Sequence, residues 1–438
     1  MLMSLQLIYG PSGSGKSYTL YKKIIEQSIR EPDREFIVIV PEQFTMQTQR
    51  ELVELHPNRG ILNIDVQSFL RLAWRIFEEV GVDTHTVLED TGKNLLLRRV
   101  ASRQKNDLTV LGRNFRKPGY ISQVKSIISE LKQYDVSLEE LDEQLRSGKK
   151  DALSYKLQDI RNLYEGFQEE LQGKYITSEE ILEELCYVVK KSEILKGCVV
   201  ALDGFTGFTP IQNKLLRELM QTAEKIYVTV TLDAWEDPMK KVSMHKLSYL
   251  SKKTIQQLAG AAKECGCMLE KPEVLGKEGS IRFRSAPALR FLERHLFRPG
   301  NQIYEAQDSQ KLERELSLHV ARDAKAEAEF AARTIWHLVR EENLRYRDIA
   351  VITGDMESFG DHMKKELQQK GIPCFIDRTR KLLLNPLVEF LRAALQIATK
   401  SFRYESVFRY LRTGLAGLKR DEIDRLENYV LALGIRGA

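Results

Sequence analysis

The sequence has little cysteine and no long apolar run, and both absences exclude classes of protein. Its 438 residues include five cysteines, an odd number without a Cys-x-x-Cys pair, so we read them as reduced thiols. Cys265 and Cys267 would supply only half of a metal site. No run approaches the roughly 18 apolar residues that a membrane helix needs. The N-terminus also lacks a signal-peptide pattern, and the sequence therefore predicts a cytoplasmic protein without membrane contact.

Strong charge of either sign is also missing. The net charge of +5 permits nucleic-acid binding but does not establish it. The hydrophobic content of 42% is sufficient for large cores, and the length predicts two to four domains.

The most informative stretch is a glycine-rich segment at residues 10–17, which fits the phosphate-loop pattern G-x-x-x-x-G-K-[ST] without a mismatch. Its residues are Gly10, Pro11, Ser12, Gly13, Ser14, Gly15, Lys16 and Ser17. Such a loop turns its backbone N–H groups toward phosphate oxygens at a helix N-terminus. Lys16 would reach the β- and γ-phosphates and Ser17 would bind Mg²⁺, so the segment predicts nucleoside triphosphate binding. The alternative is a glycine-rich turn that binds nothing.

Strand and helix patterns alternate around this segment. Apolar runs predict strands at residues 5–9, 36–40 and 61–66. The predicted helix at residues 18–30 has an apolar face of Leu20, Ile24, Ile25 and Ile29, and the helix after Ser68 has one of Phe69, Leu70, Ala73, Ile76, Phe77 and Val80. This order predicts a parallel sheet covered on both faces, with ligands at the carboxyl ends of its strands.

Residues 91–196 predict an almost wholly helical insertion, after which the strand at 199–202 and a second one at 226–232 resume the sheet. Asp203 follows the first of these strands, where an acid commonly holds Mg²⁺ in phosphate-loop enzymes. The next residue there is often a glutamate that activates water, but here it is Gly204. The alternative role for Asp203 is to cap the following loop.

Residues 271–312 are rich in arginine, with phenylalanines interleaved. This mixture suits single-stranded DNA, and Arg284 and Arg290 are candidate contacts. The alternative is a solvated basic helix that joins two domains.

A second strand and helix alternation begins near residue 313. Strands are predicted at residues 316–320, 349–353 and 374–376, with helices between them. The last residues add no polar tail or closing element, and we expect the chain to be an N-terminal fragment of a longer protein.

Several ordered motifs resemble those of superfamily 1 helicases related to UvrD and RecB, and in particular the B subunits of bacterial AddAB helicase–nucleases, also called RexB. The resemblance covers essentially the whole chain. It rests on the phosphate loop and on residues 40–45 (VPEQFT), 68–75 (SFLRLAWR), 202–205 (LDGF), 371–377 (GIPCFID), 385–387 (NPL), 428–430 (NYV) and 434–437 (GIRG).

The resemblance implies a division into domains. We expect an α/β fold with a RecA-like phosphate-loop domain at residues 1–90 and 197–270. The helical insertion at 91–196 interrupts this domain, and a basic linker at 271–312 leads to a second, incomplete RecA-like domain at 313–438.

The resemblance also implies partners and cofactors. These are ATP with Mg²⁺, an AddA-like helicase–nuclease subunit in a heterodimer, and single- and double-stranded DNA. Members of the family act in double-strand-break repair by homologous recombination and help to recognise the Chi sequence. Their iron–sulfur cluster belongs to a C-terminal nuclease domain, whose motifs this chain does not contain.

The chain departs from working helicases at three places: Gly204 replaces a glutamate, residues 231–235 lack a glutamine, and residues 351–355 lack an arginine. The sequence therefore predicts a degenerate motor that binds ATP with weak or no hydrolysis. The alternatives are an active superfamily 1 helicase, a phosphate-loop kinase or transferase, and a structural scaffold with an empty loop.

Overall fold

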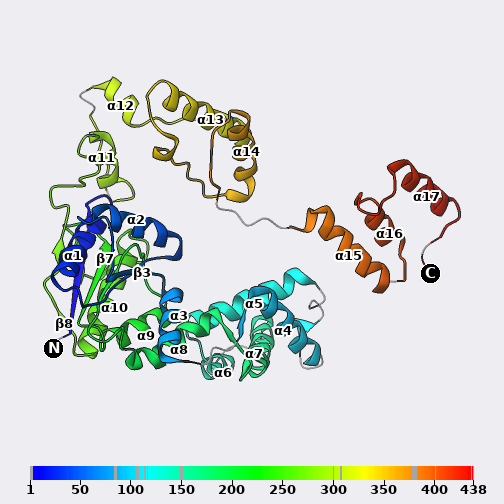
Figure 1. Ribbon diagram of the computed structural model, residues 1–438, viewed down its shortest axis with the longest axis horizontal. Coiled ribbons are helices and arrows are strands. Elements are labelled where there is room, and N and C mark those ends of the chain that lie inside the picture. Colours follow the sequence, from blue (N-terminus) through cyan, green and yellow to red (C-terminus); the bar gives the residue numbers. More distant parts are fainter. Residues whose placement is uncertain are drawn as a thin grey trace. The chain divides into compact units, whose positions relative to one another are not determined.

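The computed structural model describes residues 3–437 except 83–85, 105–107, 113–114, 116, 148–150, 299, 306–307, 377–381, 400 and 436 (Figure 1). Asp377 and Arg436, two residues of the resemblance motifs, thus lie outside the described residues. The chain forms two compact units, residues 1–317 and 318–438. Each is described by itself.

The first unit is built on a parallel sheet of seven strands among the described residues. Six strands follow the order β3-β2-β6-β7-β1-β8, and β9 also pairs with β1. Their bounds are β1 Ser4–Gly10, β2 Phe36–Ile39, β3 Ile64–Gln67, β6 Val199–Leu202, β7 Lys225–Thr231, β8 Met268–Leu269 and β9 Glu273–Val274. The mostly parallel α/β prediction is confirmed for this unit, although β3 begins three residues later than expected.

Alternate residues of the strands face two separate cores. Ile37 and Ile39 of β2 belong to one core, whereas Phe36 and Val38 belong to the other. Helices α1 (Lys16–Arg30) and α2 (Thr45–Leu55) cover the second face. The first face is covered by α3 (Phe69–Val80), α8 (Ser178–Val188), α9 (Pro210–Leu219) and α10 (Tyr249–Glu264). This two-sided burial explains the continuous apolar runs of the strands.

Two predicted apolar faces were each wrong at one residue. Ile29 is 50% exposed, because the buried stripe of α1 continues through Ser28, whose hydroxyl donates to the Ile25 carbonyl. In α3, Leu72 is buried where Leu70 was expected.

The helical insertion has its own core. It comprises α4 (Asp90–Arg103), α5 (Pro118–Gln133), α6 (Leu138–Ser147) and α7 (Ala152–Leu171), and α8 connects it to the sheet. A short parallel pair, β4 (Thr86–Leu88) with β5 (Tyr175–Thr177), was not predicted. A three-residue strand has too few alternating apolar and polar side chains to be distinguished from the helical pattern around it.

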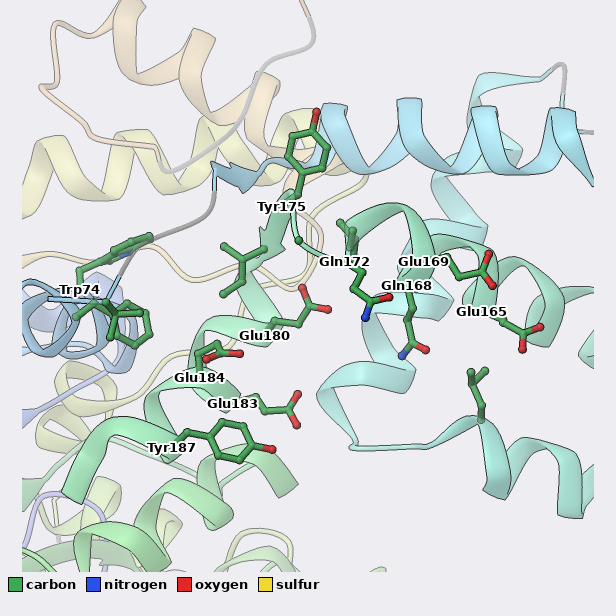
Figure 2. A pocket seen from close by; sticks show the side chains of 16 residues that line it. Trp74, Glu165, Gln168, Glu169, Gln172, Tyr175, Glu180, Glu183, Glu184 and Tyr187 are labelled. Carbon is green, nitrogen blue, oxygen red and sulfur yellow. The ribbon is translucent and has the colours of Figure 1, made fainter. Parts of the chain in front are cut away.

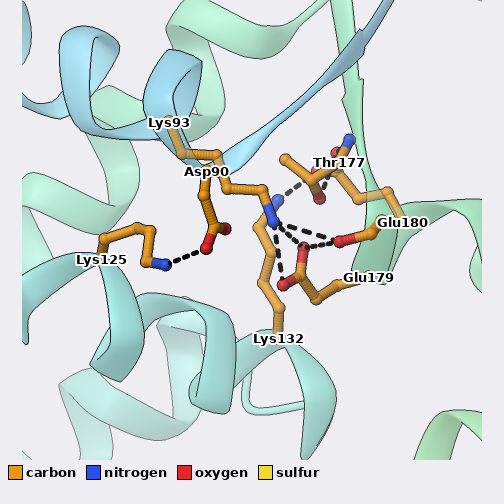
Figure 3. A network of polar contacts seen from close by, with 8 residues as sticks. Asp90, Lys93, Lys125, Lys132, Thr177, Glu179 and Glu180 are labelled. Atoms are coloured by element: carbon orange, nitrogen blue, oxygen red, sulfur yellow. Dashed lines mark hydrogen bonds and ion pairs between the residues drawn. The ribbon is translucent and has the colours of Figure 1, made fainter. Parts of the chain in front are cut away.

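A polar network fastens this insertion to the start of α8 (Figure 3). The Lys93 ammonium group, in a side chain only 4% exposed, pairs with Glu179 at 2.7 Å. Lys132 of α5 pairs with Glu180, which also accepts a hydrogen bond from the Thr177 backbone N–H at 2.8 Å. These charges are partly or fully buried and are paired with one another, so they hold the helices in one arrangement.

The region predicted as a basic linker is partly folded onto the first unit. β9 lies within it and pairs with β1. It also contains α11 (Pro287–His295) and α12 (Ser309–Glu315), which contact each other.

The second unit contains α13 (Ala324–Arg340), α14 (Met356–Gln369), α15 (Pro386–Thr399), α16 (Tyr404–Leu411) and α17 (Arg420–Ala432). Its described residues include no strand, so the strand predictions at 316–320, 349–353 and 374–376 are wrong. Val320, Ile352 and Phe375 are each at least 90% exposed. Their β-branched or aromatic character favours strands, but an extended segment becomes a strand only with a ladder partner. The prediction of a second RecA-like domain is not confirmed.

Single-turn helices complete the chain at Glu42–Phe44, Val189–Lys191, Tyr346–Asp348 and Leu382–Leu384. Among the described residues, no helix is both long and apolar enough to span a bilayer.

Candidate nucleotide-binding site

Residues 10–17, here called the glycine loop, connect the end of β1 to the start of α1. Gly13 and Gly15 adopt positive φ angles of 73° and 87°, which side-chain-bearing residues rarely adopt. Gly15 precedes α1 without a side-chain cap, so no described side chain accepts a hydrogen bond from the first N–H groups of the helix. A helix N-terminus of this kind at the carboxyl end of a parallel strand favours the binding of an anion.

Lys16 is turned into the glycine loop. Its Nζ donates to the carbonyl oxygens of Gly10 at 3.1 Å and Pro11 at 2.9 Å. Burial lowers the pKa of Lys16, nearby Asp203 opposes that shift, and Arg282 adds to it. Its amine is therefore held inside the loop by two neutral carbonyls.

Asp203 lies at the carboxyl end of β6 and is only 5% exposed. Its two oxygens accept hydrogen bonds from Tyr21 at 2.7 Å and from Thr229 at 2.5 Å. Burial and the Asp203 charge raise the pKa of the Tyr21 phenol, which keeps this donor protonated. The carboxylate is thus oriented by two neutral hydroxyls.

The fold places the sequence-predicted residues Lys16 and Asp203 near the same edge of the sheet, because Lys16 begins α1 and Tyr21 of this helix is hydrogen-bonded to Asp203. Their charges interact, and Ser17 follows Lys16 in the first turn of α1. A serine hydroxyl and a buried carboxylate are suitable groups for Mg²⁺ with a bound nucleotide. Within the described residues, no cluster of histidine, cysteine and acidic side chains could hold a metal without other ligands.

Gly204 has φ 78°, in the left-handed region. A Cβ atom there would lie 3.5 Å from the Pro41 Cδ, an ordinary contact. Space therefore allows a side chain after Asp203, but the backbone conformation favours glycine.

Residues 275–282, here called the flanking segment, lie against the glycine loop and were not predicted to belong to the site. The Arg282 N–H donates to the Gly13 carbonyl at 3.1 Å, and a Cβ built on Gly13 would stand 2.6 Å from Ser280 Oγ. A Cβ on Gly276 would stand 2.9 Å from the Pro11 ring. The sequence signal within this segment was the presence of two glycines, Gly276 and Gly279. In the structure both adopt positive φ angles.

A second wall comes from α11 and the residues after it. The Arg298 guanidinium binds the Asp233 carboxylate through two contacts of 2.9 Å, and Asp233 follows β7. A cavity of about 380 Å³ is lined by Ser12 of the glycine loop together with Asp233, Glu293 and Arg298. Desolvation by burial raises the pKa of Glu293, which also interacts with Lys16.

The two candidate DNA contacts differ in their surroundings. Arg290 donates to the Glu278 carbonyl within the same unit. Arg284 is exposed, and its side chain has no hydrogen bond or ion pair with the part of the chain that the structure describes. Phe291, one of the interleaved aromatic residues, packs against His295 and Tyr304.

A larger hollow of about 860 Å³ lies between α3, β5, α7 and α8 (Figure 2). Trp74, Tyr175 and Tyr187 line it together with glutamates such as Glu183 and Glu184. None of its lining residues belongs to the glycine loop, so it is separate from the site formed by Lys16 and Asp203.

Known proteins are similar to this chain over nearly all of its length. Residues 7–293 match the family described as "ADDB, N-terminal". A relative from Lachnoclostridium phytofermentans is 47% identical over 99% of this chain and 38% of its own length. Relatives from Clostridium tetani and Clostridium novyi are each 36% identical over the same shares. All three are named as the B subunit of an "ATP-dependent helicase/deoxyribonuclease", and this chain spans only 38% of their length.

Proposed function

This chain belongs to the AddB N-terminal family, and from that premise we propose that it is the nucleotide-binding, helicase-like part of the B subunit of an ATP-dependent helicase/deoxyribonuclease. The observation that carries the proposal is the shared position of Lys16 and Asp203 at the carboxyl edge of a parallel sheet. Lys16 begins α1 at its uncapped N-terminus, and Asp203 is hydrogen-bonded to Tyr21 of the same helix. The predicted ligand is ATP with Mg²⁺, held by residues 10–17 and by Asp203.

Nucleotide binding without efficient hydrolysis is the second part of the proposal. The water-activating carboxylate that commonly follows the metal-binding acid is replaced by Gly204. Both Asp203 oxygens already accept hydrogen bonds from Tyr21 and Thr229, so this carboxylate is poorly placed to take over as the base. We therefore propose a degenerate motor in which nucleotide supports structure or regulation.

The proposed partners follow from the family. The names of the relatives describe one subunit of a helicase/deoxyribonuclease and so support a complex with a second one, which we propose is an AddA-like helicase–nuclease. The proposed substrate of the complex is single- and double-stranded DNA in recombinational repair, with a contribution to Chi recognition. Nuclease chemistry and the iron–sulfur cluster are assigned to parts of such a protein that lie beyond this chain.

The test is ATP binding and hydrolysis by this chain, with and without single-stranded DNA. We expect Mg²⁺-dependent binding by calorimetry and little turnover in either condition. Absence of binding would contradict the nucleotide site. Turnover strongly stimulated by DNA would instead identify an active motor whose base is supplied by another residue.

A further inference from the structure

Among the described residues, two buried hydroxyl groups lack hydrogen-bond partners, one within the glycine loop and one in the flanking segment. Ser14 is 2% exposed and Ser280 is 3% exposed, and neither Oγ has a partner among the described residues. An unpaired hydroxyl in the interior costs free energy, so native proteins seldom keep one without a reason. A polar ligand that enters the site would supply the missing partner.

Ser280 points at the middle of the glycine loop. A Cβ added to Gly13 would stand 2.6 Å from the Ser280 Oγ and 2.7 Å from the Arg282 Cβ. The Arg282 backbone N–H fixes this approach by donating to the Gly13 carbonyl at 3.1 Å. The flanking segment is anchored at its other end, where the Leu275 N–H donates to the Tyr9 carbonyl at 2.8 Å.

Two cations, Lys16 and Arg282, contribute positive charge at the same place, where Asp203 and Glu293 also act on Lys16. Within the described residues, the exposed Arg282 side chain has no hydrogen bond or ion pair, and its charge lowers the pKa of Lys16. The hydrogen bonds of Lys16 to described residues go to the neutral carbonyls of Gly10 and Pro11. Two cations near free helix N–H groups and an unpaired hydroxyl make a site that an anion would stabilise.

We propose that the flanking segment is part of the phosphate site, and that Ser280 and Arg282 bind the phosphate chain of the nucleotide. The inference rests on the proposed nucleotide binding and adds two ligand residues that lie outside the phosphate-loop pattern. Ser280 donates its hydroxyl proton to a phosphate oxygen, and Arg282 adds a charge-assisted hydrogen bond. Position 13 then requires glycine, because Ser280 and Arg282 leave no space for a Cβ atom there.

The first experiment compares Ser280→Ala with the unchanged 438-residue chain by calorimetry, using Mg-ATP and inorganic tripolyphosphate as ligands. We expect affinity for both ligands to fall by at least about tenfold, the effect of one lost hydrogen bond to a charged group. The unliganded variant should melt at the same temperature or higher, because the change removes an unsatisfied buried hydroxyl. Ser285→Ala, at an exposed serine of the same region, is the matched control and should change neither quantity.

The second variant, Arg282→Gln, removes an exposed charge and tests the proposal without disturbing the interior. We expect weaker binding of both ligands and a smaller loss of affinity when salt is added. Unchanged affinities in Ser280→Ala and Arg282→Gln would overturn the inference. A loss for ATP with tripolyphosphate unaffected would also overturn it, because the contact would then be to the nucleoside.

Lys16→Ala separates this inference from the function on which it rests. Suppose that the unchanged chain binds ATP, that Lys16→Ala abolishes this binding, and that Ser280→Ala and Arg282→Gln have no effect on it. In that case only the flanking-segment inference fails. If the unchanged chain binds neither ligand, the proposed function fails with it.

Discussion

Tyr21 donates a hydrogen bond from its buried hydroxyl to Asp203 at 2.7 Å, and thereby links α1 to the carboxyl end of β6. The same hydroxyl lies 3.3 Å from the Thr48 hydroxyl of α2. A residue of the first helix thus orients the acid that the sequence predicted as a metal ligand. The contact joins segments more than 180 residues apart in the sequence.

Tyr21→Phe tests this link. The variant leaves one oxygen of a buried carboxylate without a donor, so we expect the free energy of unfolding to fall by about 1.5–3 kcal/mol, the range for hydrogen bonds to charged groups. Urea denaturation measures the change. Tyr18→Phe is the control on the same helix, since Tyr18 is 58% exposed, and it should be nearly neutral. Equal effects of the two variants would contradict a structural role for the bond.

Lys16→Ala should abolish nucleotide binding and leave the fold intact. Among the residues that the structure describes, the Lys16 ammonium group donates only to carbonyls of the glycine loop, so its removal costs few packing interactions. Calorimetry with Mg-ATP measures the binding, and circular dichroism monitors the fold. Lys22→Ala, whose parent side chain is 62% exposed on α1, should bind as the unchanged chain does. Unchanged binding by Lys16→Ala would refute the assignment of the site.

The cysteines should react with a thiol reagent in an order set by burial. Burial raises the pKa of Cys198 to about 12 and that of Cys186 to about 11, so at pH 8 both remain protonated and unreactive. Cys374 is exposed and should be labelled first by Ellman's reagent. Because these buried thiols bind protons more tightly when folded, their contribution to stability is present below their unfolded pKa near 8.5–9 and is lost as the pH rises above it. Rapid labelling of Cys198 in the folded chain would contradict this burial.

Arg284→Gln tests the DNA contact predicted from the basic stretch. If Arg284 neutralises a phosphate, the variant should bind single-stranded DNA more weakly, and the slope of log affinity against log salt should fall by about 0.7. Arg290→Gln is the informative comparison. Arg290 already donates to the Glu278 carbonyl, so its substitution should change the slope less. Fluorescence anisotropy at several salt concentrations measures both. An unchanged slope for Arg284→Gln would leave this stretch as a solvated surface.

The local patterns of the sequence predicted the first unit well. Continuous apolar runs such as residues 36–39 indicated buried parallel strands, because both faces of this sheet are covered. The glycine loop was also visible, since its glycine positions and its strand–helix context are local. Both features depend on residues that are close in the sequence.

The long-range contacts of the site could not be predicted from the sequence. Ser280 approaches Gly13 only because β9 pairs with β1, a contact between segments at opposite ends of the first unit that no local pattern encodes. The failed strand prediction at residues 349–353 has a similar cause, since β propensity identifies an extended segment but does not supply a partner for it. Tertiary pairing decides both cases.

Gly204→Glu should not convert this site into a motor. At φ 78° a non-glycine residue costs about 1–2 kcal/mol, so the variant should be less stable by roughly that amount. A carboxylate there would also lack a second polar group to align water, because Asp233, the acid that follows β7, is held by Arg298 through two contacts of 2.9 Å. We therefore expect Mg-ATP turnover to stay low with and without single-stranded DNA.

Gly204→Ala isolates the backbone strain from the effect of the carboxylate, and urea denaturation with a phosphate-release assay measures both properties. The alanine and glutamate variants should lose similar stability and show similarly low turnover. If DNA-dependent hydrolysis appeared in Gly204→Glu but not in Gly204→Ala, the missing base would be the principal defect. The remaining groups around Lys16 and Asp203 would then be competent for catalysis, and ATP hydrolysis at this site would have to be regarded as an energy source for DNA translocation.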